Sequence, residues 1–433
     1  MISEKHFIGP AAIIEKKKKY IMPCLAHFYK NPQEMVKGSM QYLWDSNGKK
    51  YLDCYAGVSV MNCGHCNPDI IQPMKAQMDE LQHVCNIYLT ENFVNLAERL
   101  AEVTPGALQK CFFCSTGSEA TEGALLLAEV YNGNSEIIAL RQGLHGRTKL
   151  GMSVTGLTMW RTAPTPVGGI HFAPNPYCYR CPLGKKPDTC DLACANAVED
   201  LVKTATSGHP GAFIAETIQG NAGIVVPPKG YFQRVKEILA QYGTLLIIDE
   251  VQTGFARTGK MFGIENFDVV PDIMCMAKAL GNGAPISCFI STAKIADTYT
   301  RPGASTLGGN PVSSTAGLAV LDYIEKHDLC KNAAERGEQL RAGLRDLQTR
   351  HGVIGDVRGL GLMDGAEFIH PDGTEAPELL DDVLEEMKDR GYIIGKNGAG
   401  RNVMAFQPPL VITEQNVDDV LDELDRVLTE KHL

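Results

Sequence analysis

Two short apolar stretches, each ending in charged residues, decide the fold of this chain: residues 244–250, TLLIIDE, and residues 272–278, DIMCMAK. Runs of this length and composition are typical of strands buried in a parallel sheet. Asp249 closes the first strand pattern and Lys278 follows the second. Because ligands collect where the carboxyl ends of parallel strands meet, we expect the carboxylate and the amine to face one crevice.

A carboxylate and a lysine amine in one crevice fit the chemistry of pyridoxal phosphate. A lysine bonds the aldehyde of this cofactor as a Schiff base, and a carboxylate keeps the pyridine nitrogen protonated so that the ring withdraws electrons. We therefore predict Lys278 and Asp249 as the catalytic residues.

Strand and helix patterns alternate on both sides of these two stretches, which predicts βαβ units and a mainly parallel sheet. The fold class we expect is α/β, with a large domain built on a mainly parallel seven-stranded sheet and a smaller α+β domain. The seven expected strands cover residues 110–114, 136–140, 171–173, 212–218, 244–249, 272–277 and 287–291.

Three regions follow from the change in pattern along the chain. Residues 1–58 are expected to join the small domain and contain a hairpin, in which Asn47-Gly48 turns between two alternating runs. Residues 59–311 form the large domain. Residues 312–433 form the small domain, with helices expected at 313–326, 333–350, 378–390 and from 414, and strands at 353–358 and 362–369.

Bulk properties exclude several classes of partner. The net charge of −10 argues against a nucleic-acid partner, which calls for a basic face. No apolar run approaches the ~20 residues that a bilayer needs, and the lysine-rich start lacks a signal peptide. Many of the 14 cysteines lie in apolar runs, which suits a reducing compartment. We expect a cytoplasmic protein.

Residues 115–119, STGSE, lie between an expected strand and an expected helix. Small residues at a helix N-terminus leave N–H groups free for an anion, and the helix dipole favours negative charge there. Plain helix capping is the alternative, but the neighbouring aspartate and lysine patterns favour a phosphate site.

Taken together, these motifs give a chain that resembles the class III, or ω-amino, aminotransferases among the fold-type-I pyridoxal phosphate enzymes. The resemblance covers nearly the whole length. It rests on five motifs in order: FCSTGSEA at 113–120, HGRT at 145–148, DEVQTGF at 249–255, AKALGNG at 277–283 and STLGGNP at 305–311.

The resemblance implies a role for each motif residue. Lys278 would bond the cofactor and move the proton, and Asp249 would pair with the ring nitrogen. Thr306 would complete the phosphate site of a second subunit, which implies a homodimer. The other implied cofactor residues are Thr116, Gly117 and Ser118 at the phosphate, and Leu144, His145, Glu216, Val251 and Gln252 around the ring.

Three residues are expected at the substrate. Arg147 follows His-Gly and would fork onto the distal acid of an ω-amino substrate, with a structural salt bridge as the alternative. Trp160 is a candidate for the mouth of the site, with surface packing as the alternative. Val58 is the third candidate.

Three positions depart from the family pattern. Leu144 stands where an aromatic residue usually stacks on the ring. In the family, an arginine binds the α-carboxylate of the substrate, and an acid pairs with this arginine when the carboxylate is absent. Asn221 replaces the acid in this chain, and Ala405 replaces the arginine. The two replacements are consistent with each other, since a buried acid left without its arginine would lower the stability of the fold. Arg401 is a candidate substitute for the missing arginine.

These departures leave the reaction open between three possibilities. The first is an aminotransferase that moves the amino group of a small ω-amino acid or related amine, such as β-alanine, 4-aminobutyrate or taurine, to pyruvate, glyoxylate or 2-oxoglutarate. The second is a lyase acting on an aminoalkyl phosphonate, phosphate or sulfonate without a keto acid. The third is a non-catalytic cofactor binder.

Four cysteines follow the CxxC and CxxxC spacing of a zinc knuckle: Cys178, Cys181, Cys190 and Cys194. Free thiols or a labile disulfide are the alternative, and we assign no metal to the site.

Overall fold

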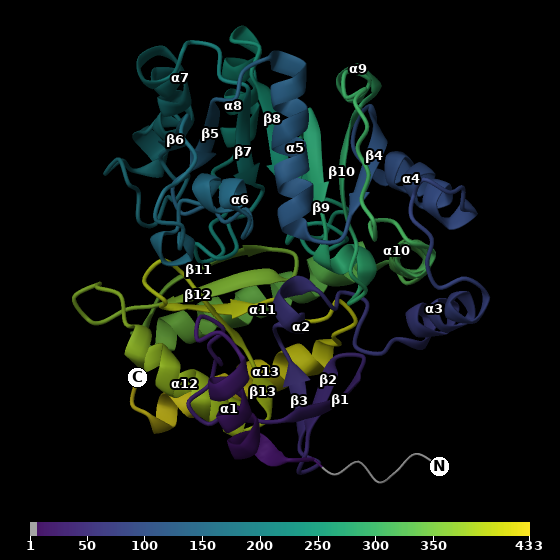
Figure 1. Cartoon of the computed structure of the whole chain (residues 1–433). Coiled ribbons are helices and arrows are strands. Elements are labelled where there is room, and N and C mark those ends of the chain that lie inside the picture. Colours follow the sequence, from purple (N-terminus) through teal and green to yellow (C-terminus); the bar gives the residue numbers. More distant parts are fainter. Residues whose placement is uncertain (1–6) are drawn as a thin grey trace.

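The computed structural model describes residues 7–433, and a seven-stranded sheet forms its centre (Figure 1). The strand order is β4-β10-β9-β8-β7-β5-β6, and β10 runs in the opposite direction to the other six strands. The α/β fold class with a mainly parallel seven-stranded sheet is therefore confirmed. The strands are β4 Leu108–Cys114, β5 Ile137–Leu140, β6 Ile170–Ala173, β7 Ala212–Glu216, β8 Leu245–Asp249, β9 Ile273–Met276 and β10 Ser287–Thr292.

Helices cover this sheet, which is why its central strands carry apolar residues on both faces. Every residue of β7 and β8 is buried. Helix α5 crosses one face of the sheet (Figure 1) and packs on β9 and β10. The helices around the sheet are α3 Pro68–Glu80, α4 Glu91–Val103, α5 Gly117–Asn132, α6 Lys149–Val154, α7 Ala193–Ala205, α8 Tyr231–Gln241, α9 Ala293–Ala296 and α10 Pro311–Lys326.

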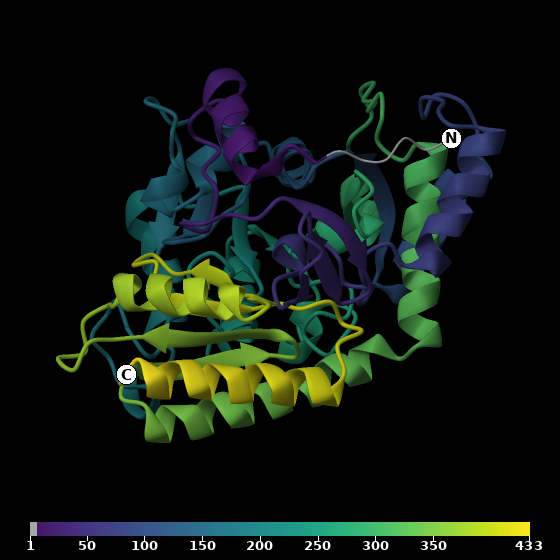
Figure 2. The same ribbon diagram turned by 90° about the horizontal axis from the view of Figure 1, so that it is seen from below.

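The C-terminal part is built on a four-stranded sheet of order β11-β12-β15-β14. Figure 2 shows α11 and α13 lying side by side along this sheet, as their mutual packing requires. Thr413 caps α13 as its sequence position predicts. The elements are α11 Leu329–Arg350, β11 Ile354–Leu360, β12 Met363–Phe368, α12 Pro377–Asp389, β14 Gly395–Asn397, β15 Val403–Phe406 and α13 Glu414–Glu430.

The N-terminal segment forms a second small sheet of order β1-β2-β3-β13. The predicted hairpin is present as β2 and β3, and β13 from the C-terminal part pairs parallel with β3. Segments far apart in the sequence therefore share one sheet. The domain boundaries expected at residues 58 and 311 stay a prediction. The remaining elements are α1 Gly9–Tyr20, β1 Met35–Ser39, β2 Tyr42–Asp45, β3 Lys50–Asp53, α2 Ala56–Ser59 and β13 Tyr392–Ile393.

Within residues 7–433, every helix is either too short or too polar to span a bilayer.

Candidate active site

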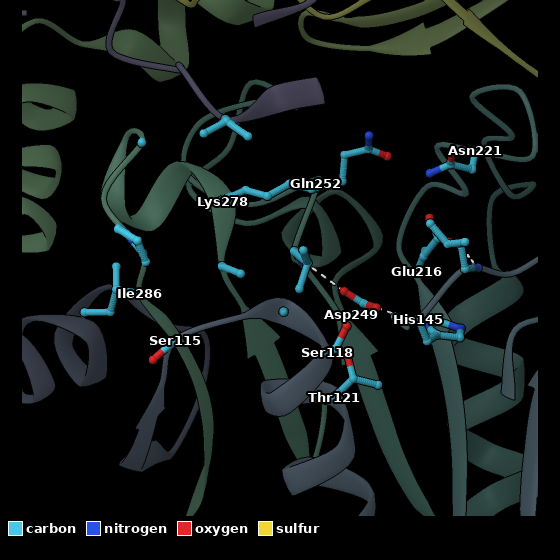
Figure 3. A pocket seen from close by; sticks show the side chains of 18 of the residues that line it. Ser115, Ser118, Thr121, His145, Glu216, Asn221, Asp249, Gln252, Lys278 and Ile286 are labelled. Atoms are coloured by element: carbon cyan, nitrogen blue, oxygen red, sulfur yellow. Dashed lines mark hydrogen bonds and ion pairs between the residues drawn. The ribbon is translucent and has the colours of Figure 1, made fainter. Parts of the chain in front are cut away.

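A cavity of about 320 Å³ lies at the carboxyl edge of the central sheet (Figure 3). Asp249 ends β8, Glu216 ends β7, and Lys278 follows β9 by two residues, so neighbouring strands deliver three charged side chains to its wall. Leu144 and His145 reach the same cavity from the loop after β5. Its volume falls in the ~300–1,000 Å³ range of small-molecule sites.

Lys278 is held in an unusual backbone conformation in this cavity. Its φ of 48° lies in the left-handed region of backbone conformation, which residues other than glycine and asparagine rarely adopt. Burial lowers the pKa of the amine, and the negative charges of Asp249 and Glu216 oppose this only in part. The result is a lysine whose neutral, nucleophilic form is favoured by the site.

Both oxygens of Asp249 are bonded within the site. Oδ2 lies 2.8 Å from His145 Nδ1, and Oδ1 accepts the backbone N–H of Val251 at 3.0 Å. Burial alone would lower the pKa of His145, but the bond to Asp249 and its charge outweigh burial, so the pKa is raised. His145 therefore fixes the orientation of the Asp249 carboxylate in the cavity.

Glu216 is the second buried carboxyl group. Its two oxygens accept the backbone N–H groups of Leu144 at 2.9 Å and Gly220 at 3.0 Å. Burial raises its pKa to about 7, His145 lowers it, and the charge of Asp249 raises it again. One carboxyl group of the site thus changes charge near neutral pH.

Replacing Glu216 by glutamine is expected to change how stability depends on pH. Because ionised Glu216 is disfavoured in the folded state, the wild type loses stability as the pH rises from the ordinary value of 4.5 through about 7. Glu216→Gln cannot ionise. Its unfolding free energy relative to the wild type should therefore improve by about 2 kcal/mol between pH 5 and pH 8.

Urea denaturation of the two apoproteins at both pH values measures this difference. The exposed Glu129, changed to glutamine, serves as the control and should give no such trend. If the difference in unfolding free energy between Glu216→Gln and the wild type stays constant between pH 5 and pH 8, the raised pKa of buried Glu216 is contradicted.

The first turn of α5 forms one end of the cavity. Gly117 and Ser118 line the cavity at the first two positions of the helix, where backbone N–H groups have no acceptor within the helix. Gly146 approaches Ser118 so closely that a Cβ there would lie 2.7 Å from Ser118 Oγ. Thr116 acts as the N-cap in a capping box with Glu119.

Gln252 and Val251 show that the cavity fits pyridoxal phosphate. Both amide atoms of Gln252 are buried and lack a hydrogen-bond partner within residues 7–433, so they are free to bond a ring hydroxyl. Val251 supplies an apolar surface beside Gly117. Together with an amine, a paired carboxylate and a helix N-terminus, these groups match the aldehyde, ring nitrogen and phosphate of the cofactor.

Five predicted residues lie outside the cavity lining of the single chain. Arg147 and Thr306 are exposed, and Trp160 is 41% exposed. Thr116 lies between two lining residues, and Val58 lies two positions before the lining residue Val60. Arg147 forms no ion pair within the described residues, so its alternative role as a structural salt bridge has no support. The role of Thr306 concerns a second subunit and stays a prediction.

Val58 belongs to a strained turn that precedes the cavity wall. Ala56, Gly57, Val58 and Ser59 all have φ between 49° and 69°, which makes α2 a left-handed turn. Left-handed geometry costs roughly 1–2 kcal/mol for each residue other than glycine. The turn ends at Val60, which lines the cavity in the place expected for Val58.

Two of the three departures from the family pattern, Asn221 and Ala405, lie close to the lining residue Ile218 or in the lining itself. Asn221 lines the cavity, and Ala405 packs with Ile218, another lining residue, in a small apolar cluster. Arg401 instead donates to the Lys396 carbonyl at 2.8 Å. Lys278 is the only lysine or arginine among the lining residues of the described chain.

The four cysteines of the CxxC and CxxxC pattern line a separate small cavity beside α7. All four are free thiols. Within residues 7–433 no group of three or more histidine, cysteine, aspartate or glutamate side chains is placed to hold a metal ion.

Several lining residues were not predicted from the sequence. Ile286 reaches the site because β10 is antiparallel, which brings the start of this strand, rather than its end, to the carboxyl edge. Thr121 follows the predicted phosphate motif of residues 115–119 in the same helix, and the motif itself could have indicated it. Val60 and Ile218 had no chemical signal in the sequence.

Comparisons with known proteins place this geometry in one family. The family model described as aminotransferase class-III matches residues 26–428. A protein of Arabidopsis thaliana named alanine–glyoxylate aminotransferase 2 homolog 2, mitochondrial, is 41% identical, over 97% of this chain and 88% of its own length. A leucine/methionine racemase of Thermococcus litoralis is 38% identical, over 96% of this chain and 95% of its own length.

Solved structures agree in fold over nearly the full length. An aminotransferase of Bacillus anthracis has a TM-score of 0.90 at 29% identity, covering 97% of this chain and 98% of that chain. A phospholyase from Arthrobacter, solved with phosphoethanolamine, has a TM-score of 0.88 at 31% identity, covering 96% and 99%. The chain therefore belongs to the class III aminotransferases, a family of pyridoxal-phosphate-dependent enzymes.

Proposed function

We propose that this enzyme transfers the amino group of a small ω-amino acid or related amine to a 2-oxo acid such as pyruvate, glyoxylate or 2-oxoglutarate. The observation that carries the proposal is the placement of Lys278 and Asp249 on one buried cavity at the ends of neighbouring strands. Family membership supports the reaction type, and the amine remains part of the proposal.

Each side chain has a defined task in this reaction. Pyridoxal phosphate supplies an aldehyde and an electron-withdrawing ring when it is bound. Lys278 provides the amine that holds this aldehyde and later moves a proton to and from the amine-bearing carbon, which its lowered pKa favours. Asp249, held by His145, would pair with the ring nitrogen and keep it protonated.

The remaining groups bind and orient the cofactor. Gln252, whose buried amide has no partner among the described residues, would bond the ring hydroxyl, and the N-terminus of α5 at Gly117 and Ser118 would hold the phosphate. Leu144 offers dispersion contact to the ring in place of aromatic stacking.

A screen of amine donors against 2-oxo acids, with a control lacking any acceptor, tests the proposal. Turnover that requires both an amine and a keto acid supports amino transfer. Turnover without a keto acid would replace this proposal with a lyase reaction.

The lyase is the second candidate because of Asn221 and Ala405. Among the lining residues no arginine is placed to clamp an α-carboxylate, and an enzyme that needs no keto acid needs no such clamp. The similar phospholyase shows that the fold also carries elimination chemistry in a relative. Ammonia release from an aminoalkyl phosphate or phosphonate, measured without acceptor, distinguishes the two candidates.

Arg147 is proposed to bind the distal acid of the donor. Its backbone follows Gly146 at the cavity wall, and its guanidinium is without an ion-pair partner in the described chain. Arg147→Ala is expected to raise KM for acidic donors by about tenfold, the loss of one charge-assisted hydrogen bond, and to leave KM for neutral amines unchanged. Steady-state kinetics with 4-aminobutyrate and a neutral amine of similar length measure this difference, and equal effects on both would remove Arg147 from the substrate site.

We also propose that two copies of the chain form a homodimer in which Thr306 reaches the partner's phosphate site. Exposed apolar side chains support an interface around this residue, since such groups rarely gather on a free surface. Leu89 is fully exposed, Ile87 is 72% exposed and Leu307, next to Thr306, is 55% exposed. Light scattering of the purified protein should give twice the mass of the chain.

A cytoplasmic location is proposed on the state of the cysteines. All 14 are free thiols in the structure, which suits a reducing compartment.

A further inference from the structure

The loop of residues 220–224 contributes one residue to the wall of the cavity. It follows β7 and is closed by mutual backbone hydrogen bonds between Gln219 and Val225. The loop presents Asn221 to the cavity, and its first N–H, from Gly220, bonds Glu216. The position of the loop therefore affects the placement of both Asn221 and Glu216 in the site.

The same loop sets the position of Gln252. A Cβ on Gly220 would lie 1.5 Å from Gln252 Oε1, so the backbone of Gly220 packs directly against the amide. This amide is the group with no partner of its own among the described residues. A shift of the loop would therefore move the amide that faces the cofactor.

Residues of the C-terminal part hold the loop through its carbonyl groups. Asn397 donates to the Gly220 carbonyl at 3.1 Å, and the N–H of Gly398 donates to the Asn221 carbonyl at 3.0 Å. Four of the five loop carbonyls accept hydrogen bonds from this part of the chain. The other two of these carbonyls belong to Gly223 and Ile224.

Arg358 of β11 donates to both of these carbonyls. Its Nη2 and Nε lie 2.6 Å and 3.0 Å from the Gly223 oxygen, and Nε lies 3.2 Å from the Ile224 oxygen. The guanidinium is fixed from behind by Asp356 at 2.6 Å and Glu367 at 2.9 Å. Only a planar fork with several donors can meet these acceptors at once.

We infer that Arg358 is a positioning residue of the cofactor site: by holding the carbonyls of Gly223 and Ile224, it fixes the loop 220–224 against Gln252. The inference rests on the proposed role of Gln252 at the ring hydroxyl. Arg358 itself does not line the cavity, so its effect is transmitted through the loop backbone.

Arg358→Lys tests this inference, because lysine keeps the charge beside Glu367 and cannot serve both carbonyls. Apoenzyme is titrated with pyridoxal phosphate, and the visible spectrum of the loaded protein is recorded. We expect the Kd of the cofactor to rise about tenfold, equivalent to about 1.4 kcal/mol. We also expect the visible maximum to move, because the Gln252 amide no longer meets the ring hydroxyl in the same way.

Arg180→Lys is the matched control. Arg180 also pairs with Glu367, but its remaining bond goes to the Gly373 carbonyl, away from the loop. This variant disturbs the same ion pair and should keep the wild-type Kd within about twofold and the wild-type spectrum. An unchanged Kd and spectrum in Arg358→Lys, or an equal rise in Arg180→Lys, would overturn the inference.

A milder variant decides the matter if Arg358→Lys does not fold. Tyr55 Oη donates to Asn397 Oδ1 at 3.0 Å and so orients the amide that holds Gly220. Tyr55→Phe should weaken cofactor binding in the same direction by a smaller factor, and wild-type binding would contradict the loop mechanism. Since these readouts require no amine substrate, they stand apart from the proposed amino transfer.

Discussion

Lys278→Ala is expected to lower turnover by about 10⁴-fold or more, because one change removes both the covalent attachment of the cofactor and the group that moves the proton. The visible absorbance of the lysine-bound cofactor should disappear at the same time. The apoprotein should keep its melting temperature, since Lys278 donates no hydrogen bond that holds the fold together within the described chain. Steady-state rates, absorbance spectra and thermal unfolding measure the three effects.

Lys294→Ala is the control for this prediction. Lys294 is an exposed lysine in α9, at a distance from the cavity lining, and its loss should leave rate and colour unchanged. A Lys278→Ala enzyme that turns over at the wild-type rate would refute the assignment of the catalytic lysine.

Asp249→Asn is expected to lower kcat by about 10³-fold, the size of effect seen when one preorganised electrostatic group is removed from an active site. The amide has nearly the same shape as the carboxylate, but it has no charge to keep the ring nitrogen protonated. It also leaves His145 without the charge that raises its pKa. Cofactor affinity should fall far less than kcat, which separates a loss of electronic function from a loss of binding.

Asp272→Asn offers a matched control on the neighbouring strand. Asp272 precedes β9, so it lies at the opposite edge of the sheet, where it bonds Lys236 and the Leu246 N–H. Its neutralisation should change stability without a large change in kcat. Similar losses of kcat in both variants would mean that Asp249 acts on the fold rather than on the ring.

The sequence predicted the central sheet and the charged residues at its carboxyl edge, for a physical reason. Buried strands such as β8 require continuous apolar runs, and the charged residues that end them stand out against that background. The placement of Asp249 beside Lys278 then follows from strand adjacency. The strand β14 was missed because it is only three residues long and consists of glycine, lysine and asparagine.

Contacts between distant segments could not be predicted from single motifs. The bond from His145 to Asp249 joins residues 104 positions apart, and neither residue alone indicates it. Arg358 bonds the carbonyl oxygens of loop residues 134 and 135 positions away. Because every residue carries a carbonyl oxygen, nothing in the loop sequence indicates this contact. The left-handed turn that ends at Val60 contains the β-branched residue Val58. Residues of this type favour strands, so the local sequence does not predict the turn.

Borohydride reduction of the loaded enzyme, followed by peptide mapping, tests the central claim most directly. The reagent fixes the cofactor to whichever lysine holds it. We predict one pyridoxyl group per chain on Lys278 and no label on this peptide in Lys278→Ala. A label on a different lysine, or a loaded enzyme in which no lysine is labelled, would contradict the account.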